Sequence, residues 1–364
     1  MSKKSRSVIS VIIVLTLVLF TLAGCSKTDP APAAGGSSNS SSNSSSDSGT
    51  AAEPAEAITL PVGGHVEAEG VSDKPIRIAF LSWQNNPFFQ VIKEGAEASV
   101  EYLKNFNCTV DYISMGEDLT TELTIAGIEG AITKEYDAII VCPVFDGTEE
   151  YINKAVDAGI PVATFCAESS DPGKRLFFYG QNAYVAGQLH GKLIEEYTGG
   201  EGKVGVITGV LGAPSHDARM NGAIDYLKEN CPGITIIGPY ENSDKGEVAY
   251  SQTNDMLTAN PDLKVVYVTA GGPFGAAKAV QDAGLTGKVG VFAYDHTPEN
   301  LEYVASGEIV GLVNQDPFGQ GFDTNVIMFN YLVFGTQPAS DFIECALDVV
   351  TPDSIKELYP DYAN

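Results

Sequence analysis

The chain has 364 residues, and its 47 acidic and 21 basic residues give a formal net charge of −26. This length suits about two to three domains. The acidic balance argues against nucleic-acid binding, which needs basic surface, and it disfavours anionic substrates.

The first 24 residues have the features of a secretory signal peptide. Basic residues precede an apolar run over 8–20, and the stretch Leu22-Ala-Gly-Cys25 follows. The run is shorter than the ~20 apolar residues of a spanning helix. Leu22–Cys25 resembles a bacterial lipobox, which implies cleavage before Cys25 and lipid attachment to it. The alternative is ordinary secretion with a coincidental cysteine.

Residues 25–74 are predicted to be a flexible tether. The stretch 26–57 is rich in Ser, Asn, Ala and Pro and has almost no apolar side chains. Such a segment cannot bury enough surface to offset the entropy lost on ordering. A lipid on Cys25 would then anchor a folded domain to the membrane and leave it free to move.

From residue 76 onward, short apolar runs alternate with amphipathic stretches. Strands are expected at 76–81, 108–113, 138–142 and 161–165, and helices at 88–105, 120–134 and 147–158. Short apolar strands between amphipathic helices indicate a parallel, doubly wound sheet, which is an α/β fold.

After a polar break at 168–174 and an expected edge strand at 176–179, the pattern restarts. Strands are expected at 203–208, 235–237, 265–269, 289–293 and 310–314, and helices at 183–198, 215–230, 245–259, 275–283, 298–306 and 319–334. Two successive sets of similar size predict two similar lobes of about 130–150 residues each.

The loop between the first strand and the first helix carries an amide, Asn86, and two adjacent rings, Phe88 and Phe89. It has no cluster of glycines and no lysine, so it is not suited to phosphate. Rings cover C–H faces and amides pair with hydroxyls, which suits a small neutral polyol. The alternative is that both rings are only core residues of the helix.

Polar side chains also follow other predicted strands, namely Glu168, Arg219, Asp244, Asp295 and Gln315. Parallel α/β sheets bind ligands at the carboxyl ends of their strands, so we expect one cleft between the two lobes.

No motif of a hydrolase, zinc protease or nucleotide-binding loop occurs, so we predict neither an enzyme, a cofactor nor a metal site. The five cysteines beyond Cys25 form no CxxC pair, and we expect buried free thiols rather than a disulfide framework or a metal site. The four histidines are expected on the surface or in structural roles.

With Asn-Asn-Pro-Phe-Phe after the first strand, the chain resembles the type I periplasmic sugar-binding proteins of ABC importers, and their ribose-binding branch in particular. Further matching segments are Gly180–Gly187, Arg219-Met-Asn-Gly222, Ala293–Glu299 and Val313–Pro317. The resemblance runs from about residue 76 to about residue 347, with each segment in the family's order and spacing.

The resemblance implies two Rossmann-like lobes joined by a three-crossover hinge. The N-terminal lobe would comprise 75–181 plus 316–344, and the C-terminal lobe 182–315 plus 345–364. The implied protein is a monomer outside the cytoplasm, anchored by its lipid. It would capture a monosaccharide or related polyol and deliver it to a membrane permease.

By the same resemblance, Asn86 pairs with sugar hydroxyls and Phe88 and Phe89 cover the sugar. Arg219, Asp295 and Gln315 match the family's cleft arginine, carboxylate and crossover amide. The alternative for Arg219 and Asp295 is a structural ion pair.

Three positions depart from the ribose-binding pattern: Cys166-Ala167 replaces an Asp-Arg pair, Asp244 replaces a ring, and Gly271-Gly272 replaces Asn-Asp. We expect Glu168 to reach into the space left by Cys166 and Ala167; the alternative is that it points to solvent. The resulting cavity, rich in acceptors, would prefer a hexose or cyclic polyol over ribose.

Other functions fit parts of the pattern. A sensory lipoprotein that presents a sugar to a membrane kinase or chemoreceptor would have the same cleft. A sugar-responsive repressor shares the fold, but the lipobox and the lack of a basic helix-turn-helix oppose it. A glycosidase would need two paired carboxylates, and no such pair is evident.

Overall fold

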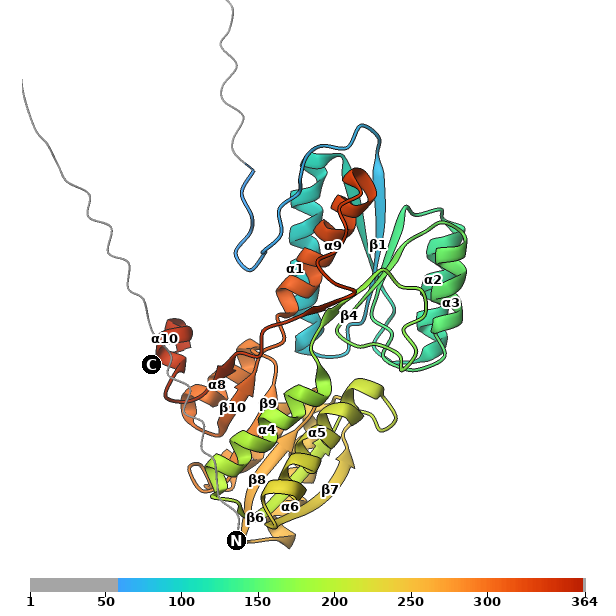
Figure 1. The fold of residues 1–364 in the computed structure, drawn as a ribbon. Coiled ribbons are helices and arrows are strands. Elements are labelled where there is room, and N and C mark those ends of the chain that lie inside the picture. The colour runs from blue at the N-terminus through green and yellow to red at the C-terminus, as the bar shows by residue number, and fades with distance from the viewer. Residues whose placement is uncertain (1–57, 363–364) are drawn as a thin grey trace, which may run out of the picture. The chain divides into compact units, whose positions relative to one another are not determined.

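Two six-stranded sheets with helices packed on them make up the residues that the computed structural model describes, 58–362 (Figure 1). The predicted α/β class with two lobes is therefore confirmed. The predicted signal peptide, Cys25 and the tether up to residue 57 lie outside the described residues. No helix within 58–362 is long and apolar enough to cross a bilayer.

The first sheet, which with its helices we call the first lobe, has the strand order β11-β5-β4-β3-β1-β2, and all its strand pairs are parallel. Its strands are β1 (Ile76–Ser82), β2 (Cys108–Ser114), β3 (Ala138–Val141), β4 (Val162–Phe165), β5 (Phe177–Gly180) and β11 (Phe342–Glu344). Its helices are α1 (Pro87–Leu103), α2 (Thr121–Thr133), α3 (Glu149–Asp157) and α9 (Pro317–Phe334), with a 3-10 turn at Lys104–Phe106. Helices α1 and α9 lie together on one face of the sheet, and α2 and α3 on the other (Figure 1).

The second sheet and its helices form the second lobe, with strand order β12-β10-β9-β8-β6-β7. Its strands are β6 (Glu201–Thr208), β7 (Gly233–Glu241), β8 (Leu263–Val268), β9 (Gly290–Tyr294), β10 (Ile309–Val313) and β12 (Val349–Val350). Its helices are α4 (Ala183–Thr198), α5 (Pro214–Asn230), α6 (Gly246–Ala259), α7 (Pro273–Asp282), α8 (Pro298–Ser306) and α10 (Ile355–Leu358), with a 3-10 turn at Pro360–Tyr362. Strand β12 is antiparallel to β10, whereas the other pairs are parallel.

The chain passes between the two sheets three times, after β5, after β10 and after β11. The second passage, which returns the chain to the first sheet, corrects one prediction. The stretch 176–179 was expected to be an edge strand, but β11 returns late in the chain and pairs with the outer side of β5. The sequence did not predict β11, because a strand of three residues is too short to show a periodic pattern of apolar side chains.

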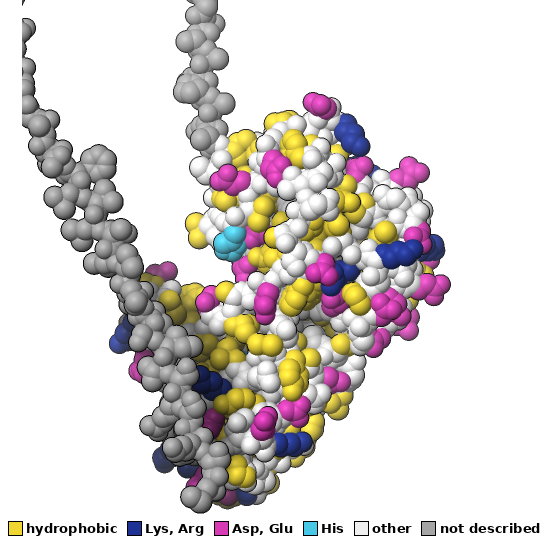
Figure 2. Space-filling model, in the orientation of Figure 1, with side chains coloured by type: hydrophobic (Ala, Val, Ile, Leu, Met, Phe, Trp, Pro, Cys, Tyr) yellow, Lys and Arg dark blue, Asp and Glu magenta, His cyan; other side chains and the backbone are white. Residues whose placement is uncertain are grey.

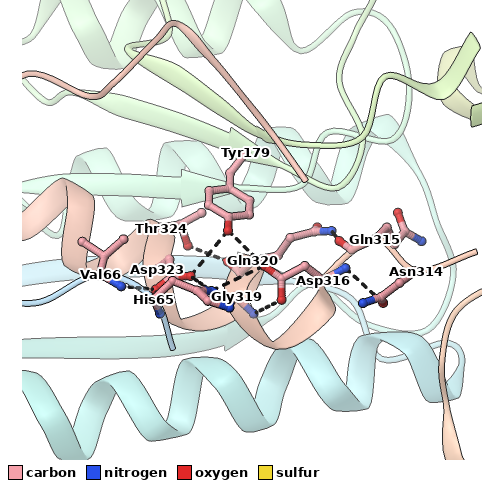
Figure 3. A network of polar contacts seen from close by, with 10 residues as sticks. All are labelled: His65, Val66, Tyr179, Asn314, Gln315, Asp316, Gly319, Gln320, Asp323 and Thr324. Carbon is pink, nitrogen blue, oxygen red and sulfur yellow. Dashed lines mark hydrogen bonds and ion pairs between the residues drawn. The ribbon is translucent and has the colours of Figure 1, made fainter. Parts of the chain in front are cut away.

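Residues 58–75 contradict the predicted tether, and we call this segment the strap. The backbone N–H groups of His65 and Val66 donate to Oδ1 of Asp323 at 2.8 and 2.9 Å, and the His65 ring nitrogen Nδ1 lies 2.8 Å from Oδ2 (Figure 3). Apolar strap residues, Leu60 among them, pack against the core of the first lobe. Asp323 lies 258 residues after His65 in the sequence, so composition alone did not reveal this contact.

The described surface carries the acidic excess expected from the sequence. Acidic side chains are spread over both lobes on the face drawn in Figure 2. Most ion pairs on the described surface join exposed side chains, for example Lys154 with Glu129, and such pairs contribute little stability. The cores of the lobes, rather than surface charge, hold the fold together.

Candidate ligand-binding site

A cavity lies at the carboxyl ends of the strands of both lobes, where parallel sheets bind ligands. It is lined by Asn86, Phe88, Phe89, Leu119, Val144, Cys166 and Ala167 of the first lobe, by Ser215, His216, Arg219, Asp244, Ala270, Gly271 and Asp295 of the second, and by Gln315 of the second passage. It brings together eight of the nine residues that the sequence analysis placed in the cleft, all except Glu168. A hollow near Lys264 and Lys288 lies instead at the amino ends of β8 and β9.

The first lobe contributes the start of α1. Asn86 caps this helix, because its Oδ1 accepts a hydrogen bond from the backbone N–H of Phe89 at 3.4 Å, and Pro87 occupies the first turn. This bond leaves the amide nitrogen of Asn86 as a donor. The rings of Phe88 and Phe89 meet edge to face, with centroids 5.4 Å apart. Both rings belong to the core of the first lobe, and both also line the cavity. They can therefore pack in the core and cover a ligand at the same time.

Arg219 of α5 is buried and held on several sides. Its Nε donates to Gln181 at 3.1 Å, its Nη1 to the Thr269 carbonyl at 3.3 Å, and its Nη2 to Gln315 at 2.6 Å. Its guanidinium carbon lies 4.1 Å from the centroid of the Tyr294 ring, a cation–π contact. A guanidinium has five N–H donors, so one N–H on each terminal nitrogen remains for a ligand.

Asp295 follows β9 with a left-handed backbone, φ 77°. Its carbonyl accepts hydrogen bonds from Thr297 and Asn300, which hold this turn in place. Its Oδ1 accepts a hydrogen bond from the Gln315 amide, and no described residue donates to its Oδ2. Burial raises the pKa of Asp295 to about 6, although Arg219 and Gln315 both act to lower it. This buried carboxylate therefore has an oxygen available to hydroxyl donors.

No ion pair joins Arg219 to Asp295 within the described residues. Both side chains bind Gln315 instead, which accepts from Arg219 and donates to Asp295. The proposed structural pairing of these two charges is thus replaced by a bridge through an amide.

Gln315 is itself held by the second passage between the lobes. Its carbonyl accepts from the side chain of Gln320 at 2.6 Å (Figure 3). The next residue, Asp316, caps α9 by accepting from the Gly319 N–H at 3.1 Å, and it also accepts from the Tyr179 hydroxyl at 2.9 Å. The crossover is therefore anchored on the first lobe, next to the strap.

Asp244 brings the two lobes into contact. Its Oδ1 accepts from the Gly271 N–H at 2.8 Å, and its Oδ2 accepts from the Asn85 amide of the first lobe at 3.4 Å. A side-chain carbon at Gly271 would lie 2.9 Å from Cβ of Asp244 and 3.0 Å from the Asn86 amide nitrogen. Glycine at 271, where the ribose-binding pattern has a side chain, permits this close approach.

His216 was not foreseen as a site residue. It was expected to be a surface or structural histidine, yet it lines the cavity from α5. The Val210 N–H donates to its Nδ1 at 3.0 Å, so in the neutral ring the proton sits on Nε2. Burial lowers the pKa of His216, which keeps the ring neutral at pH 7. His216 thus supplies an N–H donor to the cavity.

Glu168 does not line this cavity, although it lines a neighbouring surface hollow together with Cys166 and Ala167. Its carboxylate pairs with Arg175, which approaches it through both Nε and Nη2, and it accepts from the Thr164 hydroxyl at 2.7 Å. Nor does it point freely to solvent, because the ion pair holds it at the mouth of a neighbouring surface hollow. Cys166 and Ala167 themselves face the cavity.

One cluster outside the cavity has the atoms for a cation: His65, Asp316 and Asp323, whose ligand atoms lie within 4.8 Å of one another. Their oxygens already accept hydrogen bonds from the strap and from Tyr179 (Figure 3). We therefore interpret this cluster as a clamp that holds the strap.

Residues 78–337 match the family model described as a periplasmic binding protein domain. The chain belongs to this family. Among its relatives, it is 25% identical over 246 residues to the D-allose-binding periplasmic protein of Escherichia coli (strain K12), covering 65% of this chain and 78% of that protein. It is 23% identical over 240 residues to the ribose import binding protein of the same organism, with the same coverage of 65% and 78%.

Solved structures of solute-binding proteins are also similar to this chain. An ABC transporter solute-binding protein from Actinobacillus succinogenes 130z with bound D-allose is 28% identical, with a TM-score of 0.69 over 78% of this chain and 100% of that one. One from Agrobacterium vitis with bound D-fucose is 26% identical, with a TM-score of 0.71 over 79% and 98%. Since the family and the relatives named here are binding proteins, we conclude that this chain binds a ligand rather than catalyses a reaction.

Proposed function

We propose that this periplasmic binding protein captures a monosaccharide or a related polyol in the cavity between its lobes and delivers it to the permease of an ABC importer. The observation that carries the proposal is the set formed by Asp295, Gln315 and Arg219. It offers a carboxylate oxygen and guanidinium N–H groups side by side, next to the rings of Phe88 and Phe89.

This set suits a neutral ligand with many hydroxyls. Each hydroxyl both donates and accepts, so it can pair with the carboxylate and with the guanidinium at once. The carboxylates of Asp244 and Asp295 would repel an anionic ligand. Among the relatives, the two solved structures named above hold D-allose and D-fucose, both neutral sugars.

A thermal-shift screen of the 56–364 fragment against pentoses, hexoses, inositols and sugar alcohols tests the proposal. A ligand at 100 times its dissociation constant stabilises the folded state by ~2.7 kcal/mol. We expect at least one monosaccharide or polyol to raise the melting temperature of the parent, and Asp295→Asn to show a smaller shift at the same ligand concentration. Asp353→Asn, at an exposed position, is the matched control and should respond like the parent. No shift with any member of the panel would refute the proposal.

The lipid anchor is part of the same proposal. Cys25→Ser should leave the protein unprocessed or released from the membrane, while its ligand response stays unchanged. A variant that still fractionates with membranes in a processed, lipid-modified form would contradict anchoring at Cys25.

Delivery is tested by uptake. Cells lacking this chain should lose uptake of the labelled ligand identified in the screen, and the parent gene should restore it. Unchanged uptake together with a lost transcriptional response to the ligand would instead support the sensory alternative, which uses the same cavity.

A further inference from the structure

Three free thiols gather at the carboxyl edge of the first sheet. Cys142 follows β3, Cys166 follows β4 and Cys345 follows β11. The backbone N–H groups of Cys166 and Cys345 donate to the carbonyls of Tyr179 and Gly180, at the end of β5. The pleat and pairing of these strands thus bring cysteines from distant parts of the sequence to one edge.

Cys142 and Cys166 are the pair whose strands are direct neighbours. In the parallel ladder of β3 and β4, Val141 lies opposite Thr164, so Cys142 is level with Phe165 and one residue short of Cys166. The spacing and rise of regular strands would give a separation of about 6 Å between their Cα atoms. That separation is within the range of roughly 4.4–6.8 Å that a disulfide needs.

The side chains also approach each other. Burial raises the pKa of the Cys142 thiol well above its usual range, and a hydrogen bond with the Cys166 thiol raises it further. Cys166 has a left-handed backbone, φ 64°, which is uncommon for a residue with a side chain.

The two thiols differ in access. Cys142 is fully buried, and its carbonyl accepts from the Trp83 indole N–H at 3.0 Å. Cys166 alone among the five described cysteines is not buried, and it lines the ligand cavity. A small reagent that enters the cavity therefore meets Cys166 first.

We propose that Cys166 and Cys142 form a reversible disulfide by exchange with a small disulfide oxidant that enters the ligand cavity. The Cys166 thiolate attacks one sulfur of the oxidant, the oxidant's S–S bond breaks, and one small thiol leaves. The Cys142 thiol then loses its proton and its sulfur attacks the Cys166 sulfur, releasing the second small thiol. Two protein thiols become one disulfide, and one small disulfide becomes two thiols.

Such a cross-link changes the wall of the cavity, because it ties the Cys166 sulfur to the end of β3. The cross-link forms or fails to form whether or not the ligand is a sugar. Its test is therefore independent of the proposed function.

The test uses the reduced full chain, the small uncharged 2-hydroxyethyl disulfide as the probe, alkylation of the remaining thiols after unfolding, and mass spectrometry of a non-reduced digest. We expect a peptide pair joined through Cys142 and Cys166, which dithiothreitol separates again. Cys166→Ser should slow oxidation of Cys142 by at least about tenfold, since the buried thiol loses its accessible partner. Cys345→Ser should leave the cross-link intact, and circular dichroism verifies that each variant is folded.

Two results would overturn the proposal. One is a stable 2-mercaptoethanol adduct on Cys166 with Cys142 still free to be alkylated. The other is a cross-link between Cys166 and Cys345 that persists in place of the expected pair.

Discussion

Gln315 accepts a hydrogen bond from Arg219, with 2.6 Å between Oε1 and Nη2. The same amide donates through its nitrogen to Asp295. One neutral side chain thus bridges a buried cation and a buried carboxylate that form no direct ion pair with each other. Since Gln315 belongs to a segment that joins the lobes, the binding groups and the hinge are mechanically linked.

Gln315→Glu tests this bridge. A glutamate can still accept from Arg219, but it cannot donate to Asp295 and places a second negative charge beside it. Because like charges disfavour ionisation, we expect the pKa of Asp295 to rise further and ligand affinity to fall by at least about tenfold. Titration calorimetry with the tightest ligand of the screen measures the change. Gln337→Glu, on the exposed surface after α9, is the matched control; equal affinities in both variants would show that the bridge is not needed.

Binding should depend on pH through Asp295. Burial raises the pKa of this carboxyl to about 6 in the free protein. Ligand hydroxyls donate to the ionised form, so the ligand favours that form and the pKa is lower in the complex. Affinity is therefore constant well above this pKa, and it falls as the pH drops through it, by up to about tenfold per pH unit. Calorimetry from about pH 8 to about pH 5 should show this decline in the parent and a flat profile in Asp295→Asn.

His216 should contribute to specificity as a donor. His216→Phe keeps a ring in the cavity wall but removes the Nε2 N–H, which we expect to weaken binding by roughly tenfold, the value of one hydrogen bond of about 1.4 kcal/mol. A series of deoxy analogues then identifies the hydroxyl that it contacts, since the analogue lacking that hydroxyl should bind parent and variant equally. If His216→Phe weakens the binding of every analogue by the same factor, His216 acts on the shape of the cavity and not through a hydrogen bond.

The strap should stabilise the fold in a pH-dependent way. The hydrogen bond to Asp323 raises the pKa of His65 above its ordinary value. A raised histidine pKa adds stability that is fully present below the unfolded value, about 6.5, and is lost as the pH rises through the folded value. The His65 side chain is 59% exposed, so screening limits the effect to below about 1 kcal/mol. Melting curves of His65→Ala should show a larger deficit against the parent in mild acid than in mild base, and an equal deficit at both would contradict the ion pair.

The strands of the two sheets were predictable because parallel strands are buried on both faces and appear as short apolar runs. The fully buried run Ala138–Val141 is an example. Strands β11 and β12 have only three and two residues, and they exist because a partner strand provides hydrogen bonds. Their existence depends on the return path of the chain, which local sequence does not encode.

The residues of the site, too, were only partly predictable from the sequence. Asn86 and Asp295 were predictable because each lies in the loop after a strand, where the topology brings side chains to the cleft. Glu168 occupies such a loop too, but Arg175, seven residues later, pairs with it and draws it away. His216 lies three residues before Arg219 on a helix, and its role depends on the N–H of Val210, a contact that residue types alone do not reveal.

Titration calorimetry of the parent, Asp295→Ala and the control Asp353→Ala shows whether Asp295 binds the ligand. Charge-assisted hydrogen bonds to a buried carboxylate contribute ~1.5–3 kcal/mol each. We expect the parent and Asp353→Ala to bind one sugar or polyol per chain with the same affinity. Asp295→Ala should bind the same ligand at least about tenfold more weakly, with an unchanged circular dichroism spectrum. An Asp295→Ala variant that binds as tightly as the parent would show that Asp295 does not bind the ligand.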